Sequence, residues 1–458
     1  MADDYKDYQN TAYKSTIDIM ARENPTNIVS RPTKFSEDEA KTINFQLKML
    51  LSPISSTSIE AAEELLVYTE NRNGLKFLLK PEHIKRLVSL LQEDVNITIP
   101  LQFLNFMLNT KGIFMNSAIE MNIFAILKVI IEGTNDSDIL QLSFDLLTII
   151  IKYSQNYIVE AINCGLYDNL DMFTSNSSYI PSFASFLLTT LQQKKIPPNF
   201  YQKFISPLIN IYVFDDFDVK KCVIDCFCIL AEKTEDVEHI LVDNAVVSTF
   251  VDSVSLMDEQ ISPLSMKLIW KIASFQNSHK LLVQNNIFNI IKDIYLNREQ
   301  IIPNDFVFYT MNFVLQFLIE DSNDMYFILV SEFISTISVE FFYILNIEAK
   351  TSIISMLRVF IQKCTQDLFV SSIDPELILA ILELNDSNDS NLAYETVMIT
   401  LELINKMTDD EKYNSIKEYI LSDEFHDYID DLRESERQDL SERAVTLYTT
   451  ISQITNNE

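Results

Sequence analysis

Residues 268–275 read Leu-Ile-Trp-Lys-Ile-Ala-Ser-Phe, and residues 285–291 read Asn-Asn-Ile-Phe-Asn-Ile-Ile. Around each stretch the apolar residues recur at three- and four-residue spacing, first at Leu264, Leu268, Ile272 and Phe275, then at Ile287, Ile290, Ile291 and Ile294. This spacing predicts two amphipathic helices. Residues 280–283 predict a short helix between them. Asn286 predicts the turn into the second helix, because asparagine tolerates a positive φ.

A similar sequence motif recurs along the chain. Clear copies pair a turn residue with an apolar anchor: Asn122 with Leu127, Gly165 with Leu170, Asn244 with Phe250, and Asn286 with Ile291. With weaker copies the anchors run from Leu87 to Ile429, and neighbouring anchors lie 38 to 48 residues apart. Such a period is typical of solenoids built from two- or three-helix repeats. We therefore expect an all-α solenoid of about nine helical repeats.

Three prolines support the same register. Pro100, Pro181 and Pro263 precede their anchors by 27 or 28 residues. Because proline is favoured at the first position of a helix, each predicts a helix start, with Ser262 as the N-cap residue before Pro263.

The ends of the chain differ from its middle. We expect residues 1–35 to be a poorly ordered tail. Residues 36–56 predict an N-terminal cap helix with a Ser36–Glu39 capping box, residues 57–432 the repeats, and residues 433–458 a C-terminal cap helix.

Composition excludes several classes of function. The 458 residues hold 35 Lys and Arg against 66 Asp and Glu, a net charge of −31 that disfavours nucleic acid and anionic membranes as partners. Four scattered glycines cannot form a phosphate-binding loop, and four scattered histidines offer no catalytic or metal centre. We expect a protein without enzymatic activity, cofactor or metal.

The compartment follows from similar features. The acidic start lacks an apolar signal segment, apolar runs are broken by charges, and the cysteine count of five is odd. These features predict a cytoplasmic protein and leave nuclear shuttling open.

Two smaller features have alternative interpretations. Cys222, Cys226 and Cys228 could form a zinc or redox site, but their apolar neighbours favour buried core residues. His83 follows Pro81 and Glu82 at a predicted helix start, where we expect it to face solvent.

The chain resembles the armadillo repeat family. Residues 268–291 carry the resemblance most clearly, residues 140–170 and 222–250 nearly as well, and the pattern extends over residues 57–432. The resemblance implies a right-handed superhelix of helix triplets, whose long helices line a concave face that binds extended peptides or partner domains.

Nuclear-import adaptors of that family carry repeated Trp-x-x-x-Asn pairs on those helices. The matching positions here are Trp270 and Ser274, Thr148 and Lys152, and Cys228 and Glu232, so the pairs are absent. Together with Lys271, these seven positions are the candidate partner-binding residues. Trp270 has an alternative interpretation, as a tryptophan that packs in the core or between helices.

The function that we expect is a noncatalytic scaffold or adaptor whose concave face binds a protein partner with a basic or extended segment. Two alternatives remain open. One is a nucleocytoplasmic transport adaptor. The other is a regulatory subunit or cochaperone of a kinase, a phosphatase or a heat-shock chaperone ATPase.

Overall fold

The structure is a computed structural model. It describes residues 35–70, 75–93, 95–110, 114–233, 241–242, 244–275, 278–297, 302–320, 324–386, 389–407 and 411–455. Within these ranges the secondary structure is helical, without β-strands. The predicted tail, apart from Phe35, lies outside the described residues.

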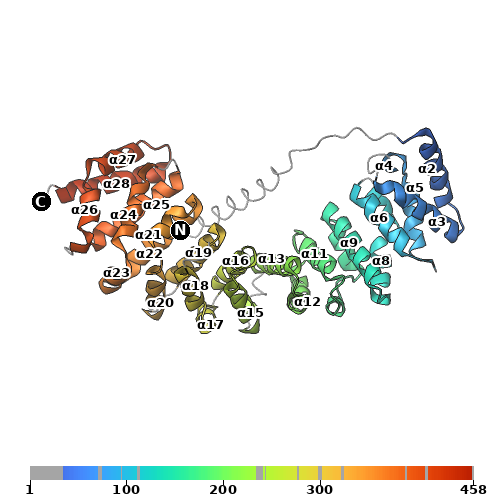
Figure 1. Ribbon diagram of the computed structural model, residues 1–458, viewed down its shortest axis with the longest axis horizontal. Helices are drawn as coiled ribbons and strands as arrows, with labels where there is room; N and C mark the ends of the chain where they lie inside the picture. Colours follow the sequence, from blue (N-terminus) through green and yellow to red (C-terminus); the bar gives the residue numbers. More distant parts are fainter. Residues whose placement is uncertain are drawn as a thin grey trace. The chain divides into compact units, whose positions relative to one another are not determined.

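The chain divides after Tyr153 into two compact units (Figure 1). The first unit contains α2 (Glu37–Leu50), α3 (Ser55–Leu66), η1 (Val67–Glu70), α4 (Leu75–Leu78), α5 (Pro81–Leu90), α6 (Thr98–Thr110), α7 (Met115–Glu120), α8 (Ile123–Gly133) and α9 (Ser137–Tyr153). In this unit α6 packs between α3 and α9.

The second unit repeats one arrangement many times. It begins with α10 (Tyr157–Asn163), η3 (Leu170–Phe173), α11 (Ile180–Leu191), η4 (Pro198–Phe200), α12 (Gln202–Tyr212), α13 (Phe217–Lys233), α15 (Asn244–Ser255), α16 (Ile261–Ala273), α17 (Ser278–Gln284) and α18 (Ile287–Leu296). It continues with α19 (Asn304–Glu320), α20 (Asp324–Ile334), α21 (Val339–Ile344), α22 (Ile347–Lys363), α23 (Gln366–Ser372), α24 (Pro375–Leu382), η6 (Glu383–Asp386), α25 (Ser390–Lys406), η7 (Glu411–Tyr413), α26 (Asn414–Ile420), α27 (Asp423–Arg433) and α28 (Gln438–Thr455).

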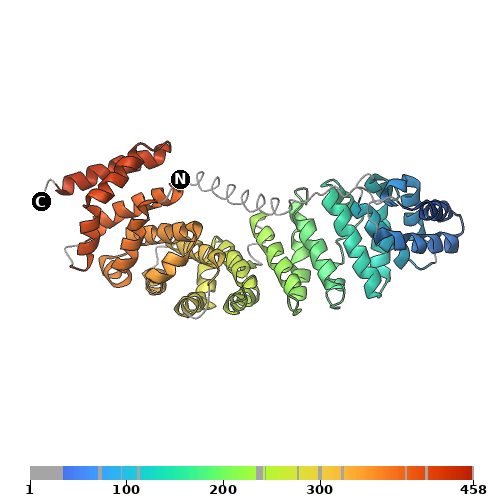
Figure 2. The same cartoon turned by 45° about the horizontal axis from the view of Figure 1, so that its top comes forward.

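A layer of long helices runs through this second unit. The helices α13, α16, α19, α22 and α25 begin 43 or 44 residues apart, and each packs against the next. The shorter helices α12, α15, α17 and α18 lie along one side of the layer (Figures 1 and 2). The packing is therefore solenoid-like, as the sequence period predicts: each helix buries its apolar stripe against neighbouring repeats.

The turn residues explain how the short helices connect. Asn122 and Asn286 are left-handed, with φ of 56° and 65°, and each precedes the first residue of its helix, α8 or α18. Gly165 is also left-handed, with φ of 72°. These three predicted turns are confirmed, whereas Asn244 belongs to α15 itself.

The prolines lie in the first turns of α6, α11 and α16, but Ser262 is not an N-cap. Helix α16 begins at Ile261, whose N–H donates to the Asp258 carboxylate at 2.8 Å. Ser262 is buried instead, and its hydroxyl donates to the Ser253 carbonyl oxygen. Asp258, three positions upstream of Ile261, thus caps the start of α16 in place of the serine that the sequence predicts.

Helices are present at both predicted cap segments. In α2, Glu39 N–H donates to Ser36 Oγ at 3.2 Å, and Ser36 N–H donates to Glu39 Oε2 at 2.7 Å, which confirms the capping box. Helix α28 packs on α25 and α27. That these helices close the stack remains a prediction.

Among the described residues, no helix combines the length and apolarity that a bilayer crossing requires.

Candidate functional site

Trp270 lies half-buried on α16, at the face where α16 meets α19. Its indole stacks on Tyr309, with ring centroids 6.0 Å apart and planes at 28°, and meets the edge of Phe308 at 6.3 Å. The two α19 residues follow Trp270 by about one repeat, so the solenoid period itself brings the three rings together. We call Trp270, Phe308 and Tyr309 the aromatic cluster.

An ion pair borders the aromatic cluster. Lys271 Nζ lies 2.5 Å from Glu232 Oε1 on α13, and 5.8 Å from the centroid of the Trp270 ring. The lysine side chain is 17% exposed and the glutamate side chain 37% exposed. A pair this open to water contributes about 0–1 kcal/mol, so its main effect is to orient the two side chains.

Two of the other predicted site residues lie in this neighbourhood with different roles. Ser274 is exposed just after α16, and its hydroxyl donates to the Lys271 carbonyl oxygen at 2.7 Å. Cys228 is only 2% exposed, and burial raises the pKa of its thiol to about 12. It therefore lies beneath the surface and offers a partner no accessible atoms.

Thr148 and Lys152 belong to α9, in the first unit. Thr148 is half-buried and donates its hydroxyl proton to the Phe144 carbonyl oxygen at 2.8 Å, while Lys152 is exposed. The structure thus gathers Trp270, Lys271, Ser274 and Glu232 in the second unit and leaves this pair in the first.

The sequence prediction missed two charged residues beside the aromatic cluster. Asp225 is half-buried on α13, and burial raises the pKa of its carboxyl group, opposed by Lys267 and Lys221. Lys267 precedes Trp270 by three residues on α16 and so shares its helix face. The sequence could have indicated Asp225, because it precedes Glu232 by two helical turns and so lies on the same face of the helix.

The long-helix layer is close to electrically neutral. Helices α13, α16, α19, α22 and α25 together hold nine Lys and Arg and eight Asp and Glu, a net charge of +1. The chain as a whole carries −31. Its excess of acid therefore lies outside these five helices, and the layer itself exerts no strongly negative field on a partner.

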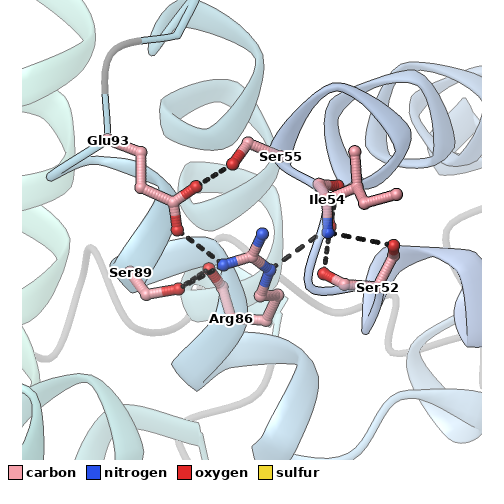
Figure 3. A network of polar contacts seen from close by, with 7 residues as sticks. Ser52, Ile54, Ser55, Arg86, Ser89 and Glu93 are labelled. Carbon is pink, nitrogen blue, oxygen red and sulfur yellow. Dashed lines mark hydrogen bonds and ion pairs between the residues drawn. The ribbon is translucent and has the colours of Figure 1, made fainter.

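Polar networks elsewhere are structural. In the first unit, Arg86 of α5 donates to Glu93 Oε1 at 2.6 Å and to Ser58 Oγ of α3 at 3.2 Å, and Ser55 donates to Glu93 Oε2 (Figure 3). The Ser55 hydrogen bond is the main cause that lowers the pKa of Glu93, with the Arg86 contact adding to it. This network joins α3 to α5 and to the turn that follows α5.

Two of the three cysteines of α13 belong to the core, as the sequence predicts. Cys226 and Cys228 are buried and Cys222 is partly exposed. In the part of the chain that the structure describes, no group of three or more His, Cys, Asp or Glu side chains is placed to hold a metal ion.

His83 was expected to face solvent, and this prediction is wrong. The residue is 4% exposed, and its Nδ1 accepts a hydrogen bond from the Lys80 N–H at 2.9 Å. It also forms a hydrogen bond with the backbone of Leu47. The imidazole is buried because it caps the start of α5 and contacts α2 at once.

Comparisons with known proteins support the fold alone. No family model matches the chain, and no curated protein sequence matches it. The crystal structure of an engineered protein superposes with a TM-score of 0.71 at 14% identity, over 90% of this chain and 99% of the other. A second engineered protein, 13% identical, covers 51% of this chain and 95% of its own with a TM-score of 0.44. The first of these superpositions shows that the all-α, solenoid-like fold is shared at low identity.

Proposed function

We propose that this protein is a noncatalytic scaffold or adaptor, and that the exposed face of its long-helix layer binds an extended or basic segment of a protein partner. We further propose the finer architecture implied by the armadillo resemblance: about nine repeats in a right-handed superhelix. The aromatic cluster is the single observation that carries the proposed binding site.

Two physical features support the cluster as an anchor. Tryptophan and tyrosine are enriched among the residues that dominate the binding energy of protein interfaces. Here both rings are held between two packed helices, so little conformational entropy would be lost when a partner binds. A half-buried indole retains one accessible side on which a partner's side chain can pack.

The charges around the cluster define the chemistry of the partner. Asp225 and Glu232 offer two carboxylates on α13, and a partner's lysine or arginine can compete with Lys271 for Glu232. Because the layer as a whole is nearly neutral, this attraction is local. The partner segment that fits best pairs one apolar or aromatic residue with a nearby basic residue.

Affinity purification from the native cell tests the proposal. We expect Trp270→Ala to reduce recovery of the principal partner, with a loss of about 2 kcal/mol or more in binding free energy. Glu232→Ala, at a more exposed position, should weaken the same partner without a change in the thermal unfolding midpoint. Tyr343→Ala, at an exposed tyrosine outside the cluster, is the control. Equal recovery by all four proteins would remove the cluster from the binding site.

The same purification separates the alternatives. A catalytic chain that copurifies and changes its turnover would indicate a regulatory subunit. Nuclear accumulation of a fluorescent fusion under export block would indicate a transport adaptor.

A further inference from the structure

Four exposed apolar residues lie at helix ends of the second unit. Val213, Leu256, Leu296 and Ile344 are 55 to 83% exposed. Each is the last residue of its helix or the residue directly after it, on α12, α15, α18 and α21 respectively. We call these four residues the apolar row.

Ring contacts and helix packing link the four helices that carry these residues. The Tyr212 and Phe250 rings join α12 to α15 with centroids 5.2 Å apart, and α15 packs on α18. The Tyr295 and Phe341 rings join α18 to α21 at 5.3 Å. Tyr212 and Tyr295 are themselves buried and directly precede Val213 and Leu296.

These buried tyrosines fix the orientation of Val213 and Leu296. A residue next to an anchored tyrosine at a helix end cannot turn inward without moving the tyrosine out of its packed site. These two side chains are therefore a permanent feature of the surface, and exposed apolar patches rimmed by polar residues are typical of interaction sites.

The turns that follow α12 and α15 are acidic. Asp215 and Asp216 follow Val213, and Asp258 and Glu259 follow Leu256, all exposed. Lys220 pairs with Asp215 at 2.8 Å, and Asp216 accepts the N–H of Val219 at 2.9 Å, which fixes its carboxylate at the start of α13. Each of these two turns thus presents one apolar side chain beside carboxylates.

We infer that the apolar row and its acidic turns form a second docking edge, which binds a basic partner segment with regularly spaced apolar residues. Charge selects this occupant. A second copy of the chain would bring another net charge of −31, and lipid headgroups or nucleic acid would bring phosphates, so each is repelled. A basic segment is attracted, and its apolar residues cover the row.

Repeat spacing sets the sequence pattern of the segment. Packed helices lie about 8–10 Å apart, and an extended chain in the polyproline II conformation rises about 3.1 Å per residue with three residues per turn, so every third residue lies on the same face and meets the next repeat. The segment that fits is extended, with an apolar residue at every third position and lysine or arginine between.

A labelled synthetic peptide of five Leu-Lys-Lys repeats, titrated with the 458-residue protein and followed by fluorescence anisotropy in physiological salt, tests this edge. We expect the double variant Val213→Ser, Leu256→Ser to weaken binding by about tenfold or more, because two large apolar contacts are lost. The matched control is Val159→Ser with Val445→Ser, two exposed valines of the same unit outside the row. It should bind as the unchanged protein does.

Three outcomes would overturn the inference. Equal affinity of both double variants would exclude the row. Equal binding of an Ala-Lys-Lys peptide would reduce the interaction to net charge. A dimer in sedimentation that the row variant abolishes would make a second copy the occupant. Peptide binding that survives Trp270→Ala separates this edge from the proposed long-helix site, so either can fail alone.

Discussion

The ammonium group of Lys363 donates a hydrogen bond to the carbonyl oxygen of Leu318, with Nζ and O 2.7 Å apart. Lys363 is the last residue of α22, and Leu318 lies in the last turn of α19. The lysine thus satisfies a carbonyl group that an α-helix leaves without an intrahelical partner, and it places positive charge at the negative end of the helix dipole.

The same kind of contact recurs at the ends of other helices. Lys233, the last residue of α13, donates to the Gln193 carbonyl oxygen just after α11 at 2.9 Å. Lys406, the last residue of α25, donates to the Cys364 carbonyl oxygen at 2.6 Å. The partners in these contacts are 40 and 42 residues apart in sequence. A terminal lysine therefore links each of these repeats to an earlier one.

Lys363→Met should remove this link while it keeps most of the apolar stem. Because the hydrogen bonds are charge-assisted but partly exposed, we expect a loss of about 1 kcal/mol in the free energy of unfolding. Urea unfolding followed by circular dichroism measures it. Lys280→Met, at an exposed position of α17, should change the midpoint by much less. Equal midpoints for the two variants would contradict the role of the contact.

The left-handed turn before α18 makes a separate prediction. Asn286 has φ of 65° and ψ of 22°, a conformation that costs a residue with a β-carbon about 1–2 kcal/mol and glycine almost nothing. We expect Asn286→Ala to lower the urea midpoint and Asn286→Gly to hold or raise it. Asn297→Ala, at a negative φ after α18, is the control. An Ala variant as stable as the Gly variant would show that the turn is not constrained.

The sequence predicted the features that depend on local pattern. Apolar stripes predicted the helices of the 268–291 region, and Asn122, Gly165 and Asn286 predicted left-handed turns, because these signals act within a few residues. A repeat period near 43 residues implies that α16 and α19 are neighbours. It could therefore have predicted that Phe308 and Tyr309 meet Trp270.

Features that depend on packing between helices could not be predicted in this way. His83 is buried because α2 covers it, and Ser262 is not a cap because Asp258 reaches the helix start first. The near-neutrality of the long-helix layer needs exact helix bounds before charges can be assigned. The apolar row needs the exposed fraction of single residues at helix ends, which no periodicity specifies.

The cysteines of α13 should react slowly with thiol reagents. Burial, with help from Asp225, raises the pKa of Cys222 to about 11, and burial raises that of Cys226 well above its usual value. Since the thiolate is the reactive form, a shift of two units leaves about a hundredfold less of it at a given pH. We expect labelling with an aromatic disulfide at pH 8 to be far slower in the folded protein than in urea. Cys164→Ser removes another partly exposed thiol, so that the labelling of this variant reports mainly on the cysteines of α13. Rapid labelling of that folded variant would contradict the core assignment.

His83 predicts how stability changes in mildly acidic solution. Burial is the main cause that lowers its pKa below the usual value, and Lys80 adds to it, while Glu82 and the hydrogen bonds to Leu47 and Lys80 oppose it. The unfolded chain, with a histidine pKa of about 6.5, therefore binds a proton before the folded chain does as the pH falls. The stabilising contribution of the neutral imidazole is complete above that pH and is lost as the pH falls toward the folded pKa.

Urea midpoints of the unchanged protein and His83→Gln at pH 7.5, 6.5 and 5.5 test this linkage. At pH 7.5 the variant should be less stable by about 1 kcal/mol, because the cap on the Lys80 N–H is weakened. The difference should shrink at pH 5.5, where the native histidine loses its advantage and glutamine does not titrate. His426→Gln, on α27, is the control for replacing a histidine by glutamine elsewhere in the protein. A difference between the unchanged protein and His83→Gln that stays constant from pH 7.5 to 5.5 would show that His83 is not held neutral by burial.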